Sequence, residues 1–119
     1  MAGPHQTFSE YDAATGTTYT RTEDTAPGLR HVVELATYAN GDTTVVAMTA
    51  TGRAWTEHRT ETRQGQITWE STRHYDAETG TLRNRREWMD LAGEWHAEEM
   101  TGHVPHLGLP VEGLGAGIR

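Results

Sequence analysis

Polar and apolar positions alternate along most of this 119-residue chain, in short runs rich in Thr, Val, Trp and Tyr. Alternation with a period of two is typical of β-strands that bury one face. Turn signals separate the runs at regular intervals, and Asn40–Gly41 is the strongest, because a type I′ turn needs positive φ at both central positions. The pattern therefore predicts eight strands and little or no helix, with the strands over residues 6–12, 16–23, 29–39, 42–51, 53–63, 66–75, 81–90 and 93–101.

Short connections predict that consecutive strands pair as antiparallel neighbours. Eight strands in this up-and-down order can close into a barrel, which removes both exposed edges. We therefore expect an all-β, single-domain antiparallel β-barrel over residues 1–103, with a two-sheet sandwich as the alternative. The expected topology resembles that of calycin-type barrels. Residues 104–119 are rich in Gly and Pro and are expected to form an irregular tail.

Hairpin loops set the register from which the two faces of the expected barrel follow. We take two-residue loops at Asn40–Gly41, Thr51–Gly52 and Gln64–Gly65. Across the next loop we choose the register that sets Tyr75 near Leu82 and Trp69 near Trp88. A slip of one residue would move every side chain of a strand to the other face.

The expected lumen mixes large rings, small side chains and a few polar groups, as ligand sites usually do. The candidate ligand-binding groups are four rings and one guanidinium, namely Tyr38, Trp69, Tyr75, Trp88 and Arg86. His58, Glu34 and Arg73 form a candidate acid–base group, because a His beside a buried carboxylate suits proton transfer near neutral pH. The alternative for these three residues is a structural polar cluster that fixes register.

Apolar residues on the opposite face predict a patch on three adjacent strands, and such a patch usually marks an interface. We expect a homodimer, with the C-terminal tail folded over the patch as one alternative and reversed faces as another. The residues of the expected interface are Val33, Leu35, Val46, Met48 and Trp55.

A metal site is a weaker hypothesis. His96 and Glu98 share one face of a strand, and His58 or His74 could supply a third ligand. Metal sites in barrels generally need three or four ligands on adjacent strands, and only two are well placed here. We therefore expect no metal and no cofactor.

The balance of charged residues indicates which classes of partner the protein can bind. The chain carries 17 acidic and 10 basic residues, a net charge of −7, and all the basic residues are Arg. This balance argues against nucleic-acid binding, which needs clustered cations. The chain has no Cys, no long apolar run and no signal-peptide pattern, so a cytoplasmic protein without membrane contact is expected.

The combined expectation is a small-molecule-binding barrel. Its sharper form is a cofactor-free cyclase or isomerase that shapes a flexible, largely apolar, carbonyl-containing substrate. One alternative is a non-enzymatic dimeric protein-interaction module whose interior is filled. Another alternative is a metal-dependent barrel enzyme. The sequence contains no phosphate-binding loop and no nucleophile elbow.

Overall fold

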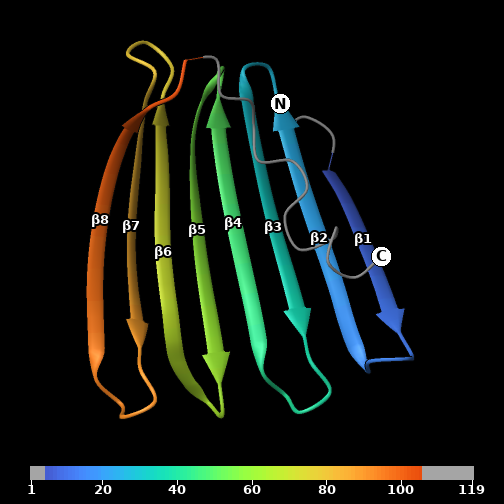
Figure 1. Cartoon of the computed structure of the whole chain (residues 1–119). Helices are drawn as coiled ribbons and strands as arrows, with labels where there is room; N and C mark the ends of the chain where they lie inside the picture. The colour runs from blue at the N-terminus through green and yellow to red at the C-terminus, as the bar shows by residue number, and fades with distance from the viewer. Residues whose placement is uncertain (1–4, 106–119) are drawn as a thin grey trace.

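The computed structural model describes residues 5–105, which form one eight-stranded antiparallel sheet (Figure 1). Sheet order equals chain order, so each strand pairs with its neighbours in sequence. The expected all-β meander is therefore confirmed. The strands are β1 (His5–Asp12), β2 (Thr17–Ala26), β3 (Leu29–Thr37), β4 (Thr43–Thr51), β5 (Ala54–Arg63), β6 (Gln66–Asp76), β7 (Thr81–Met89) and β8 (Trp95–His103).

Among residues 5–105 there is no helix that could span a membrane. Residues 106–119, which make up most of the expected tail, lie outside the described part of the chain.

The turns form where the sequence predicts them, because each one uses a glycine at positive φ. Such a conformation costs most residues energy, but glycine adopts it freely. The glycines in question are Gly16, Gly28, Gly41, Gly52, Gly65, Gly80 and Gly93, with φ between 61° and 90°.

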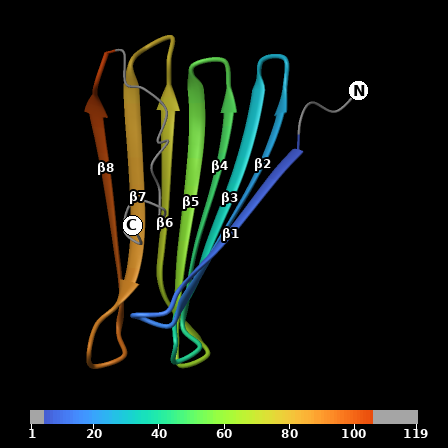
Figure 2. The same ribbon diagram turned by 90° about the vertical axis from the view of Figure 1, so that its right-hand side faces the viewer.

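The sheet is not closed into a barrel over residues 5–105, so that expectation is wrong. β1 pairs with β2 alone and β8 with β7 alone, which leaves two edge strands. The two-sheet sandwich is also wrong, because the strands form a single sheet. Figure 2 shows β1 running diagonally across the other strands, as the right-handed twist of a sheet requires. Closure would need a particular strand tilt and stagger, which alternation of side chains does not specify.

One face of the sheet, called the core face here, holds all the buried strand residues. Side chains of directly paired residues point to the same side, so this face can be followed from strand to strand. Its centre is an apolar cluster in which Trp55 stacks on Tyr75 with ring centroids 6.1 Å apart. The buried strand residues are Thr17, Tyr19, Val32, Glu34, Ala36, Thr44, Val46, Met48, Ala50, Trp55 and Tyr75.

Two shifts of one residue reverse β4 and β5 relative to the expected register. The loop after β3 spans residues 38–42 and pairs Thr37 with Thr43, where a two-residue loop was expected. A β-bulge lies between Glu61 and Thr62 of β5, opposite Thr68, so Glu61 pairs with Trp69. The expected pairs across the β6–β7 hairpin, Tyr75 with Leu82 and Trp69 with Trp88, are confirmed.

This reversal divides the expected interface patch. Val46, Met48 and Trp55 are buried on the core face. Val33 and Leu35 point to the opposite face, called the outer face here, because Val33 pairs with Ala47 and Leu35 with Val45. The five residues therefore do not form one continuous surface.

The approach of two loops at one end of the sheet gives a stability prediction. A Cβ atom on Gly16 would lie 2.8 Å from the Cβ atom of Ala39, whereas one on Gly28 would meet nothing within 4 Å. Both glycines have φ close to 71°. We expect Gly28→Ala to lower the free energy of unfolding by about 1–2 kcal/mol through backbone strain alone. Gly16→Ala should lose about 1–3 kcal/mol more, because the methyl group must displace Ala39.

Urea unfolding of both variants measures this difference. Equal losses would show that the two loops do not make a close contact.

Candidate functional site

A row of rings crosses β6, β7 and β8 on the core face. Trp69 pairs with Trp88, and Trp88 pairs with His96. The ring centroids of Trp69 and Trp88 are 6.4 Å apart, and those of Trp88 and His96 are 5.5 Å apart with the planes 24° from parallel. The guanidinium carbon of Arg86 lies 5.9 Å from the Trp69 ring and 5.4 Å from the Trp88 ring. Trp69, Arg86, Trp88 and His96 are called the ring cluster below.

A carboxylate holds Arg86 in place. Glu98 on β8 accepts hydrogen bonds from Arg86 Nη2 at 2.5 Å and from Arg86 Nε at 3.0 Å. Both side chains are more than a third exposed, so water screens this ion pair and its own contribution to stability is small. The pair instead fixes the guanidinium over the two indole rings.

Five buried side-chain polar atoms on this face have no hydrogen-bond partner within the described part of the chain, namely Glu10 Oε2, Trp55 Nε1, Arg59 Nε, Trp69 Nε1 and Asn84 Oδ1. Three of them, the indole nitrogens of Trp55 and Trp69 and the amide oxygen of Asn84, lie on the adjacent strands β5, β6 and β7. A buried donor or acceptor without a partner costs about 1–3 kcal/mol, so each such atom needs an explanation. Two donors and one acceptor on neighbouring strands leave the core face able to accept a polar partner.

The five expected ligand-binding residues all lie on the core face. Trp69, Arg86 and Trp88 belong to the ring cluster, and Tyr75 lies in the apolar cluster, where its hydroxyl donates to the carbonyl oxygen of Val104 at 2.9 Å. Tyr38 lies beyond the end of β3 under the guanidinium of Arg63, at 5.3 Å from the ring centroid.

The expected acid–base group is not assembled. His58 lies on the outer face, where its Nδ1 is 2.9 Å from Thr72 Oγ1. Arg73 lies on the core face of β6 and forms an ion pair with Glu57 at 2.7 Å, while Glu34 is buried on β3, three strands away from β6. The bulge, whose extra residue is Thr68 of β6, causes this separation, because it shifts β5 by one residue against β6 and so places His58 on the other side of the sheet.

Glu34 instead forms a buried pair with a phenol. The hydroxyl of Tyr19 donates a hydrogen bond to Glu34 Oε2, and Arg21 Nη1 lies 3.9 Å from the same oxygen. Burial, followed by the hydrogen bond and the negative charge of Glu34, raises the pKa of Tyr19 to about 12. At neutral pH the phenol is therefore a hydrogen-bond donor that holds the carboxylate, and not a base.

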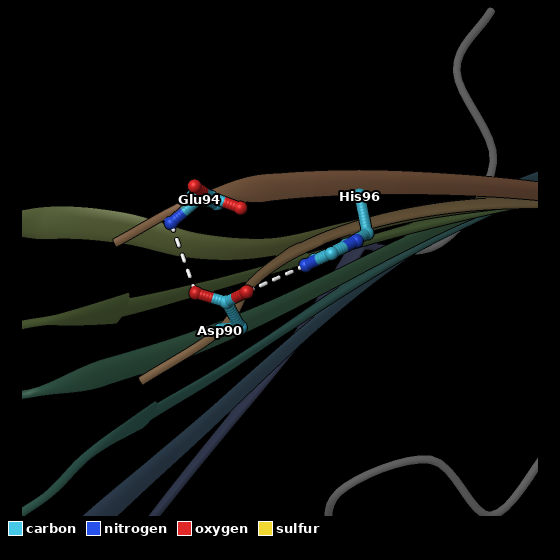
Figure 3. A group of neighbouring side chains, drawn as sticks. All are labelled: Asp90, Glu94 and His96. Atoms are coloured by element: carbon cyan, nitrogen blue, oxygen red, sulfur yellow. Dashed lines mark hydrogen bonds and ion pairs between the residues drawn. The ribbon is translucent and has the colours of Figure 1, made fainter. Parts of the chain in front are cut away.

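The expected metal ligands also separate. His96 and Glu98 lie on the core face of β8, whereas His58 and His74 lie on the outer face. His96 meets Asp90 and Glu94 instead, around the β7–β8 loop (Figure 3). One ligand atom from each of these three residues lies within 4.8 Å of the other two.

The hydrogen bonds of this loop account for the close approach of Asp90, Glu94 and His96 without an ion. Asp90 Oδ1 accepts from the backbone N–H groups of Ala92 at 2.9 Å and of Glu94 at 3.0 Å, and Asp90 Oδ2 lies 2.7 Å from His96 Nε2. The contact with His96, followed by the N–H of Glu94, lowers the pKa of Asp90. Sequence reasoning missed this cluster. Its signal is an Asp at the start of a glycine-containing loop, with a His early in the next strand.

Comparison of the chain with protein-family models, with curated proteins and with solved structures finds no match.

The Tyr19–Glu34 pair predicts a loss of stability at alkaline pH. The folded state holds the phenolic proton more tightly than the unfolded chain, in which the pKa is near 10. Its contribution to stability is thus complete below pH 10 and is lost as the pH rises toward 12. We expect the free energy of unfolding to fall over this range by at most about 1.4 kcal/mol per pH unit for this one proton. Tyr19→Phe should fall less steeply in urea unfolding between pH 8 and 12, and identical slopes would rule out the buried phenol as the cause.

The lowered pKa of Asp90 predicts a loss of stability at acid pH, in contrast to the alkaline loss expected from Tyr19. The pKa of Asp90 is lower in the folded state than the ordinary value of 3.8. Its contribution to stability is therefore present above pH 3.8 and is lost as the pH falls through the lower folded value. Asp90→Asn should be less stable than the wild type at pH 6, and the difference should shrink toward pH 2. Leu91→Ala, in the same loop, should show no such change; a pH-independent Asp90→Asn effect would contradict the assignment.

Proposed function

We propose that the protein binds a small, flat organic molecule with a hydrogen-bond acceptor, on the core face around Trp69, Arg86 and Trp88. The main observation behind this proposal is that the indole N–H of Trp69 is buried without a hydrogen-bond partner in the described residues. The half-buried ring of Trp69 lies beside Trp88 and under the Arg86 guanidinium, yet its Nε1–H has no acceptor within residues 5–105. A ligand oxygen that accepted a hydrogen bond from this N–H would remove the free-energy cost of burying the donor without a partner.

The chemistry of the ring cluster favours one class of ligand. Indole faces offer a large surface for contact with another ring, and Arg86 offers a fixed positive group beside them. Glu98 already neutralises much of the Arg86 charge, and the chain carries a net charge of −7. Both features disfavour polyanions, so the best ligand is aromatic or otherwise flat, and neutral or singly charged, with a carbonyl or similar oxygen.

Binding without catalysis is the form of the hypothesis that the geometry supports best. The expected cyclase or isomerase relied on His58 next to Glu34 and Arg73, but these residues lie on three different strands and His58 is on the opposite face from the other two. Tyr19 and Glu34 satisfy each other in the buried pair.

Titration with 8-anilinonaphthalene-1-sulfonate, a flat apolar dye with one sulfonate acceptor, tests the proposal. Trp69→Phe keeps a ring and removes only the indole N–H, and Arg86→Gln removes the charge. We expect each variant to raise the dissociation constant about tenfold, which corresponds to about 1.4 kcal/mol.

Trp95→Phe is the matched control. Trp95 is about half-exposed on the outer face of β8, so its replacement should leave the dissociation constant unchanged. Circular dichroism confirms that each variant is folded. Unchanged dye affinity in both Trp69→Phe and Arg86→Gln would refute binding at the ring cluster.

A further inference from the structure

β1 is an edge strand with few of the features that usually prevent edge strands from pairing. Natural edge strands are protected by Lys, Pro, bulges or charges in the middle of the strand. β1 has the sequence HQTFSEYD, without Lys, Arg or Pro, and both of its acidic residues lie near its C-terminal end. Its pairing with β2 runs without a bulge from His5 opposite Asp24 to Asp12 opposite Thr17. Phe8 is 43% exposed and Tyr11 is 65% exposed on this strand.

A second observation on β1 concerns Glu10. One oxygen of its carboxylate, Oε2, is buried and has no hydrogen-bond partner within residues 5–105. Glu10 lies on the core face, because it pairs with Tyr19. A buried carboxylate oxygen is costly without a donor, so this edge needs a donor from outside the strand.

We infer that two copies of this chain pair through β1, antiparallel, about a two-fold axis that passes through Phe8 perpendicular to the sheet. This axis sets Phe8 opposite the partner's Phe8 and Gln6 opposite the partner's Glu10. The side-chain amide of Gln6 then donates to the unsatisfied carboxylate, and the same contact occurs twice because the interface is isologous. The inference goes beyond ligand binding and does not depend on it.

The remaining pairs across this axis are also compatible. Thr7 faces the partner's Ser9, and no two like charges are directly opposite each other. Because residues of even number meet residues of even number, the core faces of both copies lie on one side of the joined sheet. A hollow of about 390 Å³ lined by Gln6, Thr7, Phe8, Arg21 and Glu23 lies beside the axis and leaves room for the partner's Phe8 ring.

The other edge fits a second copy less well. β8 has two adjacent carboxylates, Glu98 and Glu99, in the middle of the strand, and each lies near an arginine of β7. Full overlap of two β8 strands would place Glu99 opposite the partner's Glu99. Gly102 further weakens β8 as a pairing strand. Self-complementarity thus selects β1 and favours a copy of the same chain over an unrelated strand.

Single-cysteine crosslinking tests the axis directly, because the wild-type chain contains no Cys. Phe8→Cys places two thiols opposite each other on the axis, within the range that a disulfide spans after small movements. Tyr11→Cys places the thiols six positions apart, about 20 Å along the strands, where no disulfide can form. Met100→Cys puts a thiol on β8 at an exposure of 48%, close to that of Phe8.

We expect wild-type protein at about 100 µM to have twice the chain mass by light scattering. Under mild oxidation Phe8→Cys should become crosslinked, while Tyr11→Cys and Met100→Cys should not. Phe8→Lys, which opposes two ammonium groups on the axis, should be a folded monomer by circular dichroism and light scattering. A monomeric wild type, equal crosslinking of Phe8→Cys and Tyr11→Cys, or crosslinking through Met100→Cys alone would each overturn the inference.

Discussion

Burial of only one face is the constraint on which the rest of this structure depends. A single sheet has no second layer to cover both sides, so the large apolar side chains that are buried all lie on the same face. Trp55 stacks on Tyr75 at the centre of that face, with Val32, Met48 and Ala50 around them. The other face then carries threonine and histidine, whose hydroxyl and imidazole groups bond to one another across strands.

The strands and turns could be predicted because both depend on local chemistry. Alternation shows where a strand runs, and a glycine at positive φ shows where it ends. The loops at residues 12–16 and 76–80 share an Asp-x-x-Thr-Gly sequence, and both close with a Gly N–H to Asp carbonyl bond of 2.8 Å. Register depends on single-residue counts instead. The longer loop at residues 38–42 and the extra residue Thr68 each shift the strand register by one residue. Neither shift leaves a signal in the sequence.

The dependence of register on single-residue counts also explains which site residues the sequence places on the correct face. Trp69 and Trp88 were placed opposite each other because the β6–β7 hairpin has a regular register. His58 was misplaced because the bulge stands between it and the loop from which its register was counted. Barrel closure could not be predicted for a related reason: the twist and stagger of all eight strands together decide whether β1 reaches β8, and no local pattern encodes them.

The meander order also determines how the fold gains and loses cooperativity. Each strand makes extensive contacts only with the strands before and after it in the chain. The sheet is thus a linear array of hairpins, comparable to a repeat protein in which stability is a sum over neighbouring interfaces. Local contacts favour rapid zippering from any hairpin, and opening begins at the two ends of the array. The segment around β4, β5 and β6, which holds Trp55 and Tyr75, is then the last part to exchange its amide hydrogens with solvent.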